Sequence, residues 1–420
     1  MEPSDEKAIL PGMFALSLIT MLERLAFYLT LSVVVTYFQE TRTMSLTEAG
    51  QLYSLFFALL MFTPLFLGVI ADFTNRRAII ASGLVALMCG YLLISLLPVD
   101  YHYMLFLPLI IIALGYGAFR PNMPVVLGKL FDHNHLHHRG YIGFIIYYAF
   151  INMGALPAPF IAQYLKDIMG YEAVFLASAC IVLLAYILFL VTRKHQLHLP
   201  QKSHLTHQEH EHHSKDRVFN GLVLVGVLLS VIPINTALYQ HGMTLTFFIR
   251  DYLSDFSLVG PGIQRVNPLV VLFFSIVMAI GCYLFLKYSR YLLLKLISIG
   301  LVIAAVGYGV LILSLHLYQS SQPVSALYVA VVLISLGEAL IAPMVIYTIY
   351  RTSPRNLKGL FMAVVGFLSA IASQLLIVYA GVYEKQGALP AFTIISCVLA
   401  AFGGFFFILQ MILKISQRSS

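Results

Sequence analysis

The chain has 420 residues, of which 60% are hydrophobic and 10% are charged, and its mean hydropathy is +0.89. Soluble domains carry about a quarter charged residues, so this composition excludes an ordinary soluble enzyme. Aromatic residues make up 13% of the chain, which excludes a disordered protein. The composition is that of a membrane protein, and the net charge of +7 has to be explained by where the basic residues lie.

Twelve apolar stretches follow one another along the chain, and each has the roughly 20 residues that a helix needs to cross a bilayer. The predicted spans are residues 10–38, 48–71, 78–98, 103–130, 141–165, 173–192, 218–249, 267–286, 292–316, 325–350, 360–382 and 388–413. The sequence therefore predicts an all-α integral membrane protein with twelve transmembrane helices. The first eight residues, MEPSDEKA, lack the basic start of a secretory signal, so we expect the first span to belong to the fold.

The basic residues are distributed unevenly between the loops. An even number of spans places both termini on one side; with the N-terminus inside, the inner loops and tails hold 18 Lys and Arg and the outer loops hold five. This is the positive-inside pattern of membrane proteins. We therefore expect a multi-pass protein of the plasma membrane, in bacteria the inner membrane, with both termini cytoplasmic and no nucleic-acid partner.

The two halves of the chain carry a weak internal repeat. The pair Leu114-Gly115 is followed by Pro121, and the pair Leu336-Gly337 is followed by Pro343 at the same interval. The two copies are 222 residues apart. Two parallel six-helix repeats are the architecture of the major facilitator superfamily, to which the pattern is similar. The predicted parts are an N-terminal six-helix half, a histidine-rich cytoplasmic linker and a C-terminal six-helix half, at 1–193, 194–217 and 218–420.

The turn after the second span, GVIADFTNRR, resembles the signature of that superfamily. Gly68 permits close approach of a second helix, and Asp72 can pair with Arg76 or Arg77. We interpret the motif as a gate that holds one face of a carrier shut. The alternative is a cytoplasmic turn whose arginines only set the topology.

Only four charged residues lie well inside the predicted spans: Glu23, Arg24, Arg120 and Glu338. Each costs about 2.5–3.5 kcal/mol at a helix centre, so together they require compensation. Two cations and two anions can neutralise one another across a cavity, and such charges usually mark a substrate or ion pathway. The alternative is an ion-pair cluster that only fixes helix register.

Further candidate side chains lie on spans one and four, which also carry such charges, and on spans five, seven and eight. They are Thr20, Phe27 and Tyr28 on span one, Tyr116, Pro121 and Asn122 on span four, Tyr147, Tyr148 and Asn152 on span five, Asn235, Tyr239, Gln240 and His241 on span seven, and Asn267 on span eight. Each tyrosine or asparagine is as able to bridge helices as to contact a substrate.

At these residues the chain resembles one family, the proton-dependent oligopeptide transporters of the major facilitator superfamily. TMLERLAFY resembles the family's ExxER motif, YGAFRPNM its span-four segment, and YYAFINMGALPAP its FYxxINxGSL pattern on span five. ALYQHGMTLTFF, NPL at 267–269 and SLGEALIAP add matches on spans seven, eight and ten. The matches lie in both halves and in the family's order.

The resemblance implies a role for each matched residue. Arg24 and Arg120 are expected to bind a peptide carboxylate, and Asn267 and Glu338 its amino terminus. Hydrogen bonds from Tyr28, Tyr148, Asn152 and Tyr239 complete the expected substrate site, and proton coupling is assigned to Glu23, Arg24, Arg120, Glu338 and His241. An extended dipeptide is about 7 Å long, at 3.3–3.6 Å per residue, which suits a central cavity.

Two departures from the family concern acidic residues. Thr20 occupies the position of the first glutamate of ExxER, and Phe27 replaces the first residue of the tyrosine pair that follows this motif. On span seven, the family's acidic residue is replaced by Gln240 or its neighbour. The family associates both missing acids with proton coupling, so peptide recognition is better supported than proton symport. His241 can titrate near neutrality if it faces water.

Eleven of the fourteen histidines lie in two segments, 133–138 and 195–213. A solvated linker is the preferred interpretation; weak metal binding and pH sensing are the alternatives. His210-Glu211-His212-His213 lacks the second histidine of HExxH because Ser214 occupies that position. We therefore assign no metal site and no cofactor.

The function predicted from these features is proton-coupled uptake of di- and tripeptides by alternating access, by a chain expected to be monomeric and surrounded by lipid. Alternatives are a carrier or exporter of another zwitterion or amphiphile, such as a siderophore, a modified peptide or a drug, and a peptide receptor that does not transport. No nucleophile–base pair or metal set lies near the midplane of the predicted spans, so we do not expect an enzyme.

Overall fold

The computed structural model describes residues 3–98, 102–133, 139–196, 214–240, 243–253, 256–285, 290–318 and 323–416. These residues form helices joined by short turns, and none of them is in a strand. The helices are α1 (Pro3–Glu40), α2 (Leu46–Phe73), α3 (Arg76–Leu96), α4 (Phe106–Phe119), α5 (Asn122–His133), α6 (Gly140–Ala155), α7 (Ala158–Met169), α8 (Tyr171–Gln196), α9 (Ser214–Tyr239), α10 (Thr244–Tyr252), α11 (Phe256–Phe285), α12 (Arg290–Leu317), α13 (Val324–Thr352), α14 (Lys358–Gln386) and α15 (Ala388–Ser416), with 3-10 turns η1 (His102–Leu105) and η4 (Arg355–Leu357).

Within the described ranges, twelve helical segments are long and apolar enough to cross a membrane. The predicted all-α membrane fold is therefore confirmed. Three of the twelve consist of two helices each: α4 with α5, α6 with α7, and α9 with α10.

Proline accounts for two of these interruptions. Pro121 follows α4, and Pro157 lies between α6 and α7. Proline has no backbone N–H and its ring crowds the preceding turn, so a helix ends or kinks there. In the third interrupted span, α9 contains Pro233 and ends at Tyr239.

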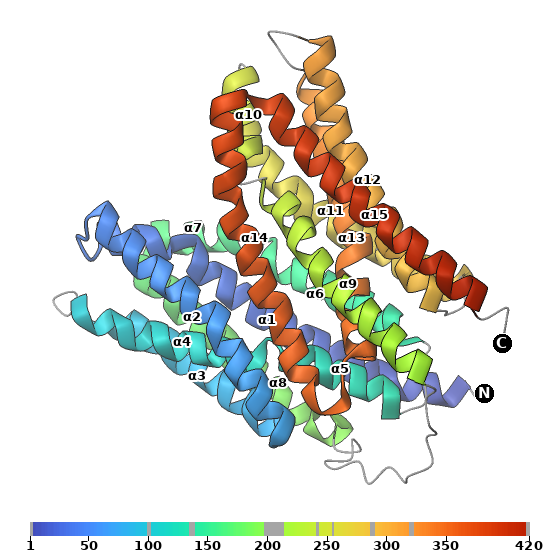
Figure 1. The fold of residues 1–420 in the computed structure, drawn as a ribbon. Coiled ribbons are helices and arrows are strands. Elements are labelled where there is room, and N and C mark those ends of the chain that lie inside the picture. The colour runs from blue at the N-terminus through green and yellow to red at the C-terminus, as the bar shows by residue number, and fades with distance from the viewer. Residues whose placement is uncertain are drawn as a thin grey trace. The chain divides into compact units, whose positions relative to one another are not determined.

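The helices pack into two compact units. Unit 1 comprises Met1–Gly143, Phe150–Arg217 and Ser353–Phe367, and unit 2 comprises Phe144–Ala149, Val218–Thr352 and Leu368–Ser420. In unit 1, α3 packs against α4 and α8; in unit 2, α12 packs against α13 and α15 (Figure 1). Each unit thus takes in a short segment from the other half of the sequence. The ranges 1–193, 194–217 and 218–420 stay predictions about the functional parts.

Small residues allow equivalent helices to approach closely in both units. A Cβ on Gly115 of α4 would lie 2.7 Å from the Gly83 carbonyl oxygen of α3, and a Cβ on Gly337 of α13 would lie 2.6 Å from the Gly300 carbonyl oxygen of α12. Only glycine permits such backbone contact, which is a common way for helices to associate in membranes. The repeat seen in the sequence thus corresponds to one packing contact used twice.

Candidate functional site

The first cluster of unit 1 is a buried ion pair on α1. Arg24 donates from Nε to Glu23 Oε2 and from Nη2 to Glu23 Oε1, each over 2.7 Å, and both side chains are buried. A two-point, charge-assisted pair of this kind offsets part of the cost of removing two charges from water. The Arg24 guanidinium also lies over the rings of Phe27 and Tyr116, 4.9 and 5.2 Å from the ring centres. Both carboxylate oxygens of Glu23 are thus bonded to Arg24.

The interruption of span four positions the second arginine. Arg120 ends α4, and its backbone N–H donates to the Tyr116 carbonyl over 2.9 Å. Its side chain is exposed, lies 5.2 Å from the centre of the Tyr116 ring and donates to the Tyr116 hydroxyl. Tyr116 therefore holds two guanidiniums, one buried and one exposed. With two arginines and one carboxylate, the cluster carries a net positive charge.

Three further predicted residues of unit 1 lie on α1 and α6. Tyr28 is half-buried, with its ring centre 5.5 Å from that of Phe27. Asn152 is nine-tenths buried on α6, and its carbonyl accepts the Leu156 N–H over 3.0 Å. Thr20 donates its hydroxyl to the Leu16 carbonyl over 2.9 Å, so it is satisfied within α1.

Unit 2 contains a buried acid whose partners are all neutral. Glu338 of α13 is 8% exposed; its Oε1 accepts the Tyr148 hydroxyl over 2.6 Å, and its Oε2 accepts Asn267 Nδ2 over 2.7 Å. Asn267 also donates to Ser335 Oγ over 3.1 Å, and Ser335 donates to the Val331 carbonyl. Among the described residues, Glu338 has no cationic partner. A carboxylate held in this way attracts a proton or a cationic group from outside.

A small cavity adjoins Glu338 within unit 2. It has a volume of about 10 Å³ and is otherwise lined by apolar side chains of α9, α12, α13 and α15. This is room for about one water molecule, so the cavity is too small to be a peptide site by itself.

The residues of span seven lie at the end of α9. Tyr239 is 38% exposed, and Asn235 donates to the Val231 carbonyl of its own helix over 2.8 Å. Gln240 is fully buried and accepts the Thr244 hydroxyl over 2.6 Å. The predicted titratable residue His241 lies outside the described residues, as do His135, His137 and His138 and the histidine-rich stretch 197–213. Within the described ranges no group of three or more His, Cys, Asp or Glu could hold a metal ion.

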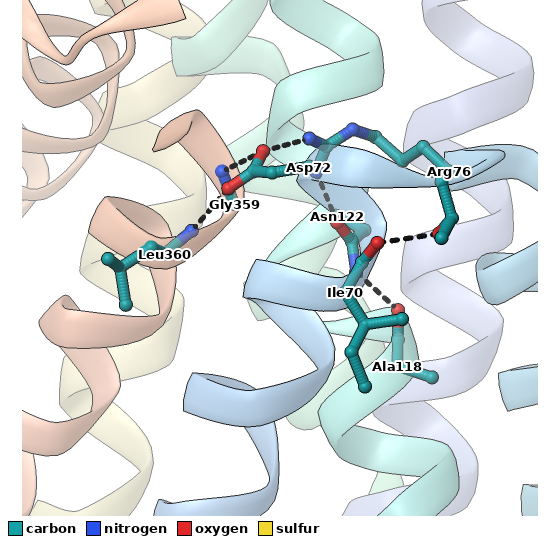
Figure 2. Close-up of polar contacts among 8 residues, drawn as sticks. Ile70, Asp72, Arg76, Ala118, Asn122, Gly359 and Leu360 are labelled. Carbon is teal, nitrogen blue, oxygen red and sulfur yellow. Dashed lines mark hydrogen bonds and ion pairs between the residues drawn. The ribbon is translucent and has the colours of Figure 1, made fainter. Parts of the chain in front are cut away.

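The predicted gate is a compact cluster in unit 1 (Figure 2). The buried Asp72 carboxylate accepts the backbone N–H of Gly359 over 2.9 Å and that of Leu360 over 3.0 Å, at the start of α14. It also pairs with Arg76. The first N–H groups of a helix have no partner within it and carry partial positive charge, so Asp72 caps α14. Gly68 completes the contact: a Cβ there would lie 2.7 Å from the Gly359 carbonyl oxygen.

Asn122 joins the gate to span four, which the sequence did not indicate. Its Oδ1 accepts Arg76 Nη1, and its Nδ2 donates to the Ala118 carbonyl over 2.8 Å (Figure 2). Arg76, rather than Arg77, thus bonds both Asp72 and Asn122, whereas the Arg77 backbone N–H is bonded by the Asn75 side chain. The Pro-Asn pair signals a helix start after a break, but which neighbour the asparagine bonds depends on the tertiary fold.

Comparison with known proteins agrees with this arrangement. The sequence profile of the Major Facilitator Superfamily matches residues 16–376. An uncharacterised transporter, YclF, of Bacillus subtilis (strain 168) is 22% identical over 479 residues, which cover 97% of this chain and 95% of YclF.

Two solved structures share the fold over nearly the whole chain. A POT family transporter in complex with 5-aminolevulinic acid has a TM-score of 0.68 at 18% identity, with 95% of this chain and 96% of the other covered. FucP, a Major Facilitator Superfamily transporter in the outward conformation, has a TM-score of 0.73 at 16% identity, with 96% and 99% covered. Both are carriers, but they are different proteins, and a shared fold does not by itself specify the cargo. The matched profile covers most of the chain, and the protein belongs to the Major Facilitator Superfamily.

Proposed function

We propose that this membrane transporter is a divergent peptide carrier that takes up di- and tripeptides together with protons by alternating access. The observation that carries the proposal is Glu338, a buried carboxylate with only neutral partners among the described residues. A peptide amino terminus supplies the missing positive charge. Asn267, which already bonds Glu338, is proposed to hold the carboxylate in position for the ammonium.

The positively charged cluster of unit 1 supports recognition of the other end of a peptide. Arg24 and Arg120 both lie over the Tyr116 ring, and Arg24 is paired with Glu23 through two hydrogen bonds. The exposed Arg120 is the group that a peptide carboxylate meets first, in a two-point pair that suits guanidinium geometry. Tyr28, Asn152 and Tyr239 are proposed to add hydrogen bonds along the peptide.

Proton coupling is proposed to depend on Glu338, with Glu23 as the second acid of the spans. Thr20 and Gln240 carry no ionisable group at the positions where related carriers have acids, and both make hydrogen bonds to their own segments. Protonation of Glu338 or Glu23 alters the hydrogen bonds and the ion pair that these acids make, and is thereby proposed to shift the balance between the two faces of the carrier. His241 stays a candidate for this role.

The gate and the membrane orientation complete the proposal. Asp72 holds the start of α14 through two backbone bonds, which favours one state of the carrier until Arg76 or Asp72 is released. The positive-inside pattern supports cytoplasmic termini and, in bacteria, the inner membrane. We propose that the carrier acts as a monomer.

Uptake into liposomes tests the proposal. The purified full chain, reconstituted with an acidic exterior, is expected to accumulate labelled alanyl-alanine, and to do so far less when the pH gradient is collapsed. Uptake no greater than in protein-free liposomes refutes peptide transport. Uptake that ignores the gradient refutes only the proton coupling.

A competing cargo is tested in the same experiment. 5-Aminolevulinic acid, the ligand in one structure of similar fold, also carries an amino group and a carboxylate. If it is taken up and alanyl-alanine is not, the carrier serves another zwitterion and the peptide assignment is wrong.

A further inference from the structure

The carboxylate proposed to receive the substrate ammonium already has a ligand from the protein. The Tyr148 hydroxyl donates to Glu338 Oε1 over 2.6 Å, and Asn267 occupies Oε2 over 2.7 Å. Both oxygens are therefore in use, and Glu338 is 8% exposed. An ammonium that approaches this carboxylate has to share or replace one of the two hydrogen bonds.

Tyr148 is the partner that an ammonium displaces most readily. Asn267 is fixed by a second bond to Ser335, which is itself bonded to the Val331 carbonyl of α13. Tyr148 is half-buried and reaches Glu338 from α6, a different helix. A phenol is a neutral donor, whereas an ammonium offers three N–H donors and a full charge, so it forms the stronger bond with a carboxylate.

The bond from Tyr148 is the polar part of a larger contact in unit 2. Phe144, one turn earlier on α6, lies with its ring centre 5.4 Å from that of Tyr347 and 6.0 Å from that of Tyr350, both on α13. These three aromatic side chains are buried. Residues Phe144–Ala149 accordingly cluster with unit 2, whereas the rest of α6 clusters with unit 1.

We infer that Tyr148 is an internal competitor for the ammonium site, rather than a ligand of the substrate. In the ligand-free protein its hydroxyl occupies Glu338 and holds segment 144–149 on α13. A substrate ammonium replaces the hydroxyl, so that the segment loses this hydrogen bond and keeps its aromatic contacts. The inference rests on the proposed function, because it assumes that Glu338 receives an amine.

The inference also sets the class of substrate. A ligand without a charged amine, such as an N-acetylated peptide, offers Glu338 no donor stronger than the phenol. It therefore leaves segment 144–149 in place. Substrates are expected to be limited to free amines, independently of which side chains they carry.

Tyr148→Phe tests the inference, because it removes the hydroxyl and keeps the ring. Loss of a competitor tightens binding, whereas loss of a substrate ligand weakens it, so the two roles differ in sign. Titration calorimetry with alanyl-alanine on the full-length protein is expected to give a dissociation constant about tenfold lower for the variant, which corresponds to about 1.4 kcal/mol. N-acetyl-alanyl-alanine is expected to bind both proteins equally.

Hydrogen exchange supplies a second readout, which can be measured first without ligand. Amides of residues 144–149 are expected to exchange faster in Tyr148→Phe than in the unmodified protein, and alanyl-alanine is expected to have the same effect on the unmodified protein alone. Tyr164→Phe, which removes a hydroxyl from a side chain that is 66% exposed on α7, is the matched control.

Unchanged or weaker binding of alanyl-alanine to Tyr148→Phe overturns the inference, as does unchanged exchange at 144–149. These outcomes leave the proposed function intact if the unmodified protein still binds and transports the peptide. Absence of any binding to the unmodified protein overturns both.

Discussion

Two buried glutamates meet the cost of burial in different ways. Glu23 is neutralised by Arg24, the next residue on the same helix, through two hydrogen bonds. Glu338 is held by the hydroxyl of Tyr148 and the amide of Asn267, which stabilise the carboxylate without cancelling its charge. The first arrangement is self-contained. The second is completed by a positive group from outside, which is why the amine site is assigned to Glu338.

Glu338→Gln is expected to weaken binding of alanyl-alanine by about tenfold or more, since a hydrogen bond to a charged group contributes about 1.5–3 kcal/mol. Binding of N-acetyl-alanyl-alanine is expected to change little, because that ligand has no ammonium. The measurement is titration calorimetry, with Glu172→Gln on the exposed start of α8 as the control. An equal loss for both peptides would refute the assigned role of Glu338.

Arg24→Met is expected to destabilise the fold by about 3–5 kcal/mol, because it leaves the fully buried Glu23 without its cation. The double variant with Glu23→Gln removes both charges and should recover much of the loss. Thermal unfolding in detergent measures both changes. If Arg24→Met alone unfolds like the unmodified protein, the pair is not a stabilising element of unit 1.

Among the helices, α14 depends on a contact with a distant part of the chain. Its first N–H groups are capped by Asp72 at the end of α2, and Gly68 brings the two backbones together (Figure 2). Arg76 and Asn122 extend the cluster to the break in span four, two residues after Arg120. The predicted gate and Arg120, the arginine proposed to bind a carboxylate, therefore both lie at the break between α4 and α5.

Gly359→Ala is expected to lower the thermal stability, since the new Cβ would clash with the backbone carbonyl oxygen of Gly68 and would lie 2.8 Å from Arg76 Nη1. Forcing a methyl group into a packed contact costs about 1–3 kcal/mol. Gly381→Ala on the same helix, where nothing lies within 4 Å, is the control and should be neutral or slightly stabilising. Equal melting temperatures for the two variants would show that the close contact with Gly68 is not tight.

At the scale of the whole molecule, hydropathy was sufficient to predict the twelve spans, because a bilayer requires long apolar helices. Pro121 accounts for the interruption beside Arg120, a local effect of a missing N–H. The partners of Tyr148 and Asn122 could not be predicted. Both bond residues far away in the sequence, and helical periodicity gives the face of a side chain but not its neighbour on another helix.

The roles of the histidine-rich segments and of His241 could not be predicted from the sequence. Their composition permits a linker, metal binding or pH sensing, and 134–138, 197–213 and 241–242 lie outside the described residues. Those interpretations stay predictions, separate from the account of the two charged clusters.

The central proposal is that Glu338 binds the ammonium of a peptide and that Arg120 binds a peptide carboxylate. Titration calorimetry of alanyl-alanine, its N-acetyl form and its carboxamide on the full-length protein tests this claim most directly. The account predicts that blocking either end weakens binding by about tenfold or more, the loss of one charge-assisted interaction. Binding of either blocked peptide as tightly as the free dipeptide would contradict it.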